Sequence, residues 1–321
     1  MTERSQGEPI GSDNPVAVAM DPTDATVATA RPIQPDTGKQ ASLTTDAWRE
    51  LRRNPLFVIS AVYVLFIIVV AIAPQLFHRV QPIESACQLK DSLLPPRAGH
   101  IFGNDLQGCD IFGSVIWGAR PSISIGLLVT IGATGLAIGI GSVAGFYGGL
   151  VDTLLSRLTD VMLGFPFLVG AIVVLSAFAK RSILTVTVVL IIFGWATLTR
   201  IMRGSVISAK DMDYVQAARA LGATNSRMLF RHVLPNAITP VMVLATIGVG
   251  GIIGSEAALT FLGVGLQAPA NSWGLSISHA QRIWKEAPHT LLFPAMVLSF
   301  TVLAFIVLGD AVRDAFDPKL R

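Results

Sequence analysis

The side chains in this sequence that could do acid, base or metal chemistry are few, and their spacing matches none of the common catalytic patterns. There is no Gly-x-x-x-x-Gly-Lys-Ser/Thr phosphate loop, because the one Gly-Lys pair, Gly38-Lys39, is followed by Gln40. No Gly-x-Ser-x-Gly elbow occurs. The histidines form no pair of the kind that holds zinc: His78, His100, His232, His279 and His289. We therefore expect no catalytic residue, no metal site and no cofactor bound by this chain.

A mostly polar segment, residues 213–235, separates two long apolar stretches and is patterned like a docking element. One helical face, at i, i+3, i+4, i+7 and i+8 spacing, consists of Tyr214, Ala217, Ala218, Leu221 and Gly222. Most of these side chains are small, so a partner can approach the backbone closely. Gly222 suits the left-handed residue that ends a helix. Thr224 or Asn225 is placed to cap a second helix, which Pro235 is expected to end. The alternative is an ordinary amphipathic loop helix.

One acidic residue, Glu256, lies inside a long apolar stretch, close to Gly250 and Gly254. An acid within a membrane span is a candidate for a functional role, here in a translocation path. The other interpretation, which we favour, is a buried carboxyl group that is hydrogen-bonded to neighbouring backbone, with the glycines allowing close helix packing. Arg157 and Asp160 lie one helical turn apart and are predicted to neutralise each other.

The composition identifies an integral membrane protein. Hydrophobic residues make up 52% of the 321 residues, charged residues only 14%, and the mean hydropathy is +0.61, whereas soluble domains carry about 25% charged residues. The basic residues are scattered rather than clustered in a stripe, so no nucleic-acid partner is expected. Residues 1–47 are rich in Pro, Thr, Asp, Ala and Gly and are predicted to form a disordered tail.

Six apolar stretches approach or reach the roughly 20 residues that cross a bilayer as a helix. The predicted spans cover about 56–77, 122–146, 154–179, 183–206, 237–262 and 291–312. They belong to one all-α transmembrane domain, residues 48–321. Two sizeable loops, about 78–121 and 263–290, then lie on one side of the membrane, and the second is expected to place a short helix with Trp273 and Trp284 at the interface.

The distribution of Lys and Arg sets the orientation, because cytoplasmic loops carry an excess of both. The residues that define this side precede the first span, fill the loop after the fourth span or close the chain: Arg49, Arg52, Arg53, Arg200, Arg203, Lys210, Arg219, Arg227, Arg231, Arg313, Lys319 and Arg321. Both termini and the 213–235 segment are therefore predicted to be cytoplasmic.

The 213–235 segment resembles the coupling motif of permease subunits of bacterial ABC importers. Gln216-Ala217-Ala218, Gly222 and Leu234-Pro235-Asn236 occupy the motif's places, with Gln216 where the family usually has Glu. Further stretches resemble the C-type subunits of dipeptide, oligopeptide and nickel importers: 102–105 through 118–120, 145–149, Arg157 with Asp160, 165–166, 255–257, 261–263, 272–274, 308–310 and 313–314. The resemblance covers roughly residues 45–321.

This resemblance implies a type I importer permease fold with six transmembrane helices and a cytoplasmic coupling helix. It also implies a homologous B-type permease subunit, two cytoplasmic ATPase subunits that bind ATP and Mg, and an extracytoplasmic substrate-binding protein. The chain would sit in the bacterial cytoplasmic membrane among its lipids and pass di- or oligopeptides by alternating access. Nickel or another small solute is the alternative cargo. A membrane scaffold or receptor is the alternative of a different class, and it would not need a coupling helix.

The two cysteines, Cys87 and Cys109, are both placed by the charge rule in the first outward loop, where oxidation is possible. Cys109 stands where the resembled family usually shows Arg, in a Gly-Arg-Asp pattern that reads Gly108-Cys109-Asp110 here. We predict a disulfide between them that stiffens this loop. Two unrelated thiols are the alternative.

Overall fold

The computed structural model describes residues 49, 51–82 and 87–316, and the predicted 1–47 tail lies outside them. The regular elements of this part are helices, and the bridges recorded within it are isolated. Five helices are long and apolar enough to cross a membrane, or six if one sharply bent pair counts as a single span. This agrees with the predicted all-α membrane fold.

The first long helix, α2 (Pro55–Ile72), has a proline at each boundary, Pro55 at its start and Pro74 just after its end. Asn54 caps it, since its side chain accepts from the N–H of Leu56 and of Phe57, and Pro55 fills the first turn, where no donor is needed. The predicted span continued to residue 77. The helix ends earlier because Pro74 disfavours a helical Ala73, and a short 3-10 turn, η1 (Pro74–Leu76), follows.

The central helix is α3 (Ile111–Tyr147), which begins well before the predicted span at 122. Asp110 caps it by accepting from the N–H of Gly113 at 2.9 Å. Pro121 was expected to lie in the loop, but it is buried inside the helix, on a face that also buries Gly118 and Ile125. The helix ends at Gly148, whose φ of +69° is left-handed.

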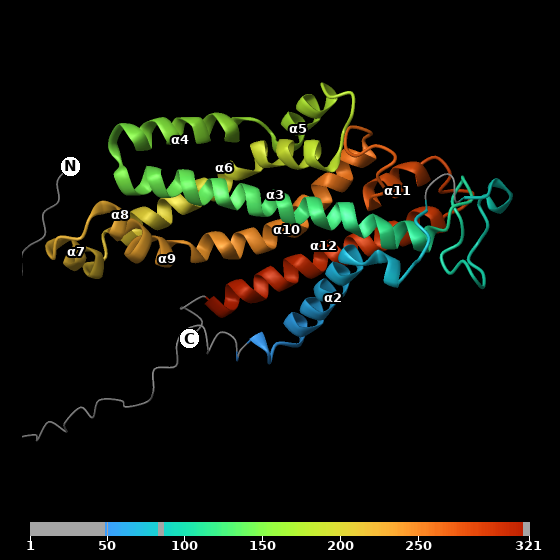
Figure 1. Cartoon of the computed structure of the whole chain (residues 1–321), viewed down its shortest axis with the longest axis horizontal. Helices are drawn as coiled ribbons and strands as arrows, with labels where there is room; N and C mark the ends of the chain where they lie inside the picture. Colours follow the sequence, from blue (N-terminus) through green and yellow to red (C-terminus); the bar gives the residue numbers. More distant parts are fainter. Residues whose placement is uncertain (1–48, 50, 83–86, 317–321) are drawn as a thin grey trace, which may run out of the picture. The chain divides into compact units, whose positions relative to one another are not determined.

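The predicted third span is a broken pair, α4 (Gly149–Gly164) and α5 (Phe167–Ser176), bent by 81°. Pro166 disfavours helical geometry at the residue before it, and Phe165 is extended, with φ −89° and ψ 125°. The next helix, α6 (Ile183–Lys210), is capped by Ser182 and runs beyond the predicted end at 206. It packs along α3, and α4 lies over it (Figure 1).

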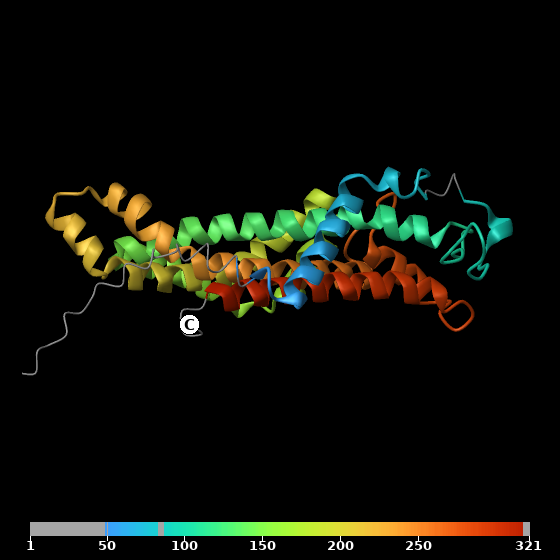
Figure 2. The same cartoon turned by 90° about the horizontal axis from the view of Figure 1, so that it is seen from below.

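Two further long helices complete the membrane part, α10 (Thr239–Phe261) and α12 (His289–Phe316), which pack against each other. Helix α2 crosses α3 and α12 obliquely (Figure 2). Between α10 and α12 lies α11 (Trp273–Ala280), the short helix expected in this loop. Trp273 is not an exposed interface anchor, as its exposed fraction is 0%, whereas Trp284 is 50% exposed.

Candidate functional site

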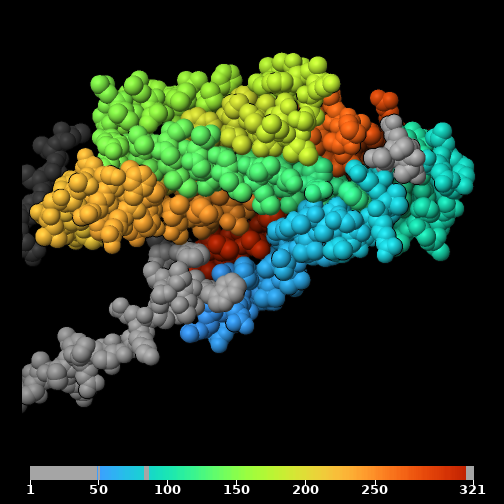
Figure 3. All heavy atoms as spheres, viewed as in Figure 1, coloured from blue at the N-terminus to red at the C-terminus, as the bar shows by residue number. Residues whose placement is uncertain are grey.

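The predicted docking element is the helix α7 (Asp213–Ala220), and its small face is open to the surroundings. Tyr214 is 41% exposed and Leu221 89%, and Gln216 and Ala217 are exposed too, while Ala218 is half-buried. The helix lies at the end of the long helices opposite to α11 (Figure 1), where it reaches the surface (Figure 3). Within the described part of the chain, no segment has to be displaced for a partner to reach this face.

One buried side chain, Val215, anchors α7 to the rest of the structure. It belongs to a cluster with Met202 and Val206 of α6 and with Met228 and Val233. This packing fixes the helix to α6.

Polar contacts add to this anchor. The Gln216 side-chain amide donates to the Lys210 carbonyl at 3.2 Å, and the Tyr214 hydroxyl donates to the His232 carbonyl at 3.4 Å. The Lys210 ammonium donates to the Gly145 carbonyl at 3.0 Å, which ties the end of α6 to α3. Gln216, the departure from the family's Glu, therefore makes a neutral hydrogen bond rather than an ion pair.

The turn after α7 confirms the predictions for Gly222 and Thr224. Gly222 has a φ of +80°, and a Cβ at that position would meet nothing within 4 Å, so the backbone conformation alone requires glycine. The N–H of Ala223 returns to the Ala218 carbonyl at 3.0 Å. Thr224 then caps α8 (Asn225–Arg227), because its hydroxyl accepts from the Arg227 N–H.

Pro235 does not end the second helix, contrary to the sequence prediction. After α8 the chain continues through a π-helical segment, η4 (Met228–Val233), into α9 (Leu234–Ala237), where Pro235 fills the first turn. In the π-helical segment the Leu234 N–H reaches back to the Leu229 carbonyl, five residues away, and the run continues past Pro235, which has no N–H to donate. Leu234 is half-buried and Pro235 is exposed.

Two ion pairs hold α4 on α6. The Arg203 guanidinium makes a two-pronged contact with Asp152, with its Nη2 2.6 Å from Oδ2. Arg200 donates to Asp160 at 2.9 Å. The predicted partner of Asp160 was Arg157, one turn away. The structure pairs Asp160 with a residue of the neighbouring helix instead, since α4 packs on α6 along this stretch.

Glu256 is fully buried between helices, with an exposed fraction of 0%. Its partners are hydroxyl groups rather than the predicted backbone: Thr260 Oγ1 donates to Oε1 at 2.9 Å, and Ser122 Oγ donates to Oε2 at 3.2 Å. Each hydroxyl in turn accepts a backbone N–H, from Leu266 at 3.1 Å and from Trp273 at 3.3 Å. The carboxyl group thus joins α10 to α3 and to the start of α11.

The two candidate glycines near Glu256 differ in their surroundings. A Cβ on Gly250 would lie 2.8 Å from the Val302 carbonyl oxygen, so α10 and α12 touch there only because the residue is glycine. A Cβ on Gly254 would meet only the tip of Val302, at 4.0 Å.

At the opposite end from α7, the structure joins Cys87 and Cys109 by a disulfide, with their Cα atoms 4.5 Å apart. We call residues 87–110 the cap. A cavity of about 1000 Å³ opens between the cap and the segment around α11, and its lining includes Asp105, Asn271 and His279. Burial raises the pKa of Asp105, although the backbone N–H groups of Cys109 and Gln107 oppose the shift.

Sequence reasoning missed several of these groups because their partners are remote. Ser122 lies 134 residues from Glu256, and nothing in its local pattern marks it. His78, His100 and Asp110 also come together, although no spacing rule links them. Within the described part of the chain, no group of three His, Cys, Asp or Glu side chains is arranged to hold a metal ion.

Apolar helices of spanning length, with an exposed, small-faced helix at their end, are typical of a membrane-embedded protein. Residues 137–321 match the family described as "Binding-protein-dependent transport system inner membrane component", and residues 42–96 match "N-terminal TM domain of oligopeptide transport permease C". The chain belongs to this family of permeases, as the resemblance in its sequence predicted.

Several curated relatives are similar over most of their length. The "Oligopeptide transport system permease protein OppC" of Bacillus subtilis is 37% identical, covering 88% of this chain and 92% of its own. The "Dipeptide transport system permease protein DppC" of Alkalihalophilus pseudofirmus is 36% identical, covering 86% and 90%. The "Glutathione transport system permease protein GsiD" of Pectobacterium atrosepticum is 34% identical, covering 85% and 90%.

Proposed function

We propose that this chain is the C-type permease subunit of an ABC importer that moves di- or oligopeptides into the cell. The observation that carries the proposal is the exposed small face of α7. A helix that Val215 holds in place, and whose small side chains remain accessible, can bind closely to a partner subunit and move with it. The names of the relatives support the peptide as cargo.

The energy source would lie outside this chain. Two cytoplasmic ATPase subunits would bind ATP and Mg, and closure of their dimer would draw the coupling helices together. A homologous B-type permease subunit would complete the translocation path. An extracytoplasmic binding protein would deliver the peptide to the end that carries the cap. Exposed apolar residues on α2 support contact with lipid: Leu56, Ile59, Val62, Leu65, Phe66, Val69 and Ile72.

The orientation follows from charge. The end that carries α7 also carries Arg219, Arg227 and Arg231. An excess of basic residues marks the cytoplasmic side. We infer that α7 and both termini face the cytoplasm, and that the chain crosses the bacterial cytoplasmic membrane several times.

The test compares two tryptophans on α7 in the importer reconstituted with its partner subunits. Ala217→Trp fills the small face, so we expect peptide uptake and transport-stimulated ATP hydrolysis to fall at least about tenfold with assembly intact. Arg219→Trp is the matched control, because Arg219 is also exposed but lies about 160° around the helix from Ala217. It should keep both activities.

Wild-type coupling in the Ala217→Trp variant would contradict the docking role and favour a scaffold or receptor. The cargo is decided by competition in the same vesicles. Labelled dipeptide uptake should be reduced by unlabelled peptides and not by nickel, and the reverse result would favour the small-solute alternative.

A further inference from the structure

One side of α4 is apolar and strongly exposed. Leu150 is 82% exposed, Leu154 69% and Val161 56%. At about 100° per residue these three side chains point in nearly the same direction, and Arg157, which is also exposed, lies within about 60° of each of them. We call these four residues the outer face of α4. It is an apolar stripe with one arginine in its middle.

The opposite side of α4 is held against α6. Thr159 is buried there, and Asp152 lies beside it, both nearly opposite to the outer face. Asp152 makes the two-pronged contact with the Arg203 guanidinium of α6. A rotation of α4 that buried the leucines would break this contact. The orientation of the outer face is therefore fixed by the packing of the chain itself.

Arg157 is the surplus charge of this pair of helices. Each of the two carboxylates, Asp152 and Asp160, pairs with an arginine of α6, Arg203 and Arg200 respectively. Three arginines thus face two carboxylates. Among the residues that the structure describes, no hydrogen bond or ion pair reaches the Arg157 guanidinium. A counter-ion for it has to come from outside this part of the chain.

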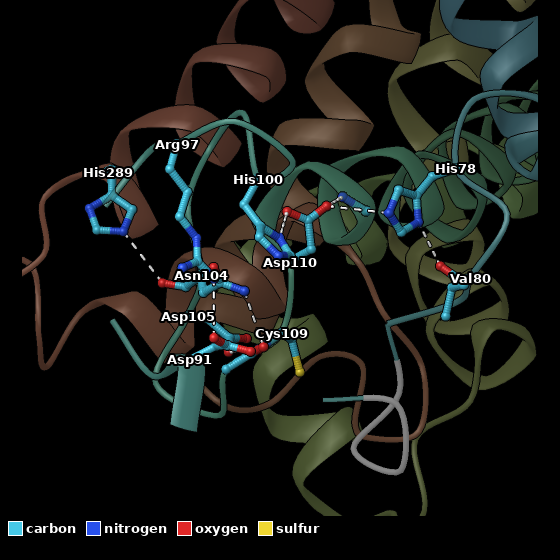
Figure 4. Close-up of polar contacts among 12 residues, drawn as sticks. His78, Val80, Asp91, Arg97, His100, Asn104, Asp105, Cys109, Asp110 and His289 are labelled. Atoms are coloured by element: carbon cyan, nitrogen blue, oxygen red, sulfur yellow. Dashed lines mark hydrogen bonds and ion pairs between the residues drawn. The ribbon is translucent and has the colours of Figure 1, made fainter. Parts of the chain in front are cut away.

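The cap shows a different arrangement of charge (Figure 4). There Asp91 pairs with Arg97 at 3.1 Å, and an Asp110 oxygen lies 3.0 Å from His100 Nδ1. These charges find partners within the chain. The outer face of α4 combines an unpaired cation with exposed leucines, and such a surface is incomplete without a second molecule.

Lipid by itself does not satisfy the outer face. Because α4 runs alongside α3 and α6, positions along it are depths in the membrane (Figure 1). Arg157 lies about 10 Å along the helix from Leu150 on one side and about 6 Å from Val161 on the other. Acyl chains around the whole stripe would leave the guanidinium unpaired in hydrocarbon, which is costly. A lipid phosphate at Arg157 would instead place Leu150 or Val161 among headgroups and water.

We propose that the outer face of α4 docks on a membrane helix of the homologous permease subunit, and that a carboxylate of that helix pairs with Arg157. A helix covers the roughly 16 Å from Leu150 to Val161 and supplies one negative charge in the middle. Between apolar surfaces an arginine–carboxylate pair is strong and fixes the register of the two helices. The identity of the partner rests on the proposed function, whereas the exposed leucines and the surplus arginine do not.

The first measurement maps what lies on this face. In the full importer complex in lipid nanodiscs, a photocrosslinking p-benzoylphenylalanine replaces Leu154, and mass spectrometry identifies the product. We expect a crosslink to the partner permease. Leu163 is the matched control position, because it is also exposed, at 37%, but lies about 180° around the same helix from Leu154. Its crosslinks should fall on lipid or on this chain.

The second measurement tests the charge. Arg157→Leu keeps the face apolar but leaves the partner's carboxylate without a counter-ion. We expect the partner permease to dissociate at least about tenfold more readily on dilution in detergent, as read by native mass spectrometry. Arg157→Lys should lie between this variant and the wild type, because it keeps the charge but not the planar fork of donors. A face that only contacts acyl chains would bind as well or better with leucine.

The outcomes separate this surface from the proposed function. Crosslinks from Leu154 to lipid alone, or an Arg157→Leu importer that holds its partner permease as tightly as the wild type does, would overturn the docking proposal. Loss of a bound phospholipid from that variant with all subunits retained would overturn it too, and would assign Arg157 to a lipid phosphate. Each of these results leaves the proposed function standing. A wild-type complex that contains no second permease would contradict the proposed function itself.

Discussion

Replacing Glu256 with leucine tests whether its carboxyl group is a structural junction or part of the peptide's route. The two oxygens are the acceptors for Ser122 and Thr260, which in turn hold the Trp273 and Leu266 N–H groups. Leucine leaves two buried hydroxyls without this acceptor, and each lost bond costs about 1–2 kcal/mol. We expect the free energy of unfolding to fall by about 2–4 kcal/mol.

Glutamine at this position should be mild. Its amide has nearly the same shape and keeps one oxygen acceptor, while its N–H group can donate to the other hydroxyl, so the loss should stay below about 1.5 kcal/mol. Peptide uptake should remain close to that of the wild type. Ser255→Ala is the control, since Ser255 is half-buried and its hydroxyl bonds only within its own helix, to the Gly251 carbonyl.

The assays are thermal unfolding of the purified importer and uptake into vesicles. If the Glu256→Leu variant were as stable as Ser255→Ala, the structural role of the Glu256 carboxyl group would be refuted. Complete loss of uptake in a fully assembled Glu256→Gln importer would refute it differently, because it would place the carboxylate in the translocation path.

Gly250→Ala should lower the free energy of unfolding by about 1–3 kcal/mol, because its Cβ would press on the Val302 carbonyl. Gly251→Ala is the matched control, since a Cβ there meets nothing within 4 Å, and thermal unfolding of both variants decides whether α10 and α12 depend on that contact. Cys87→Ser with Cys109→Ser should destabilise the cap by about 3 kcal/mol, from the loss of a closed loop of about 22 residues. Protein taken from cells without reduction should carry no alkylated thiol, and labelling of both cysteines would contradict the bridge.

Local signals in the sequence were enough to place several elements of the 213–235 segment. The small face of α7, the left-handed Gly222 and the Thr224 cap each depend on a residue and its near neighbours, so a single stretch of chain specifies them. The membrane helices are equally local, because about 20 apolar residues suffice to define a span. The break before α5 is also a local feature. Pro166 marks it in the sequence, although hydropathy alone predicts one continuous span.

The partners of the charged and polar groups were decided only by the tertiary structure. The sequence predicted Arg157 as the ion-pair partner of Asp160, but the packing of α4 on α6 brings Arg200 to it instead. It marked Glu256 but not Ser122, and it contained His78, His100 and Asp110 without any spacing that connects them. Periodicity specifies which face of a helix is buried, whereas hydrogen bonds and ion pairs act over about 3 Å and depend on how helices remote in sequence come to lie beside one another.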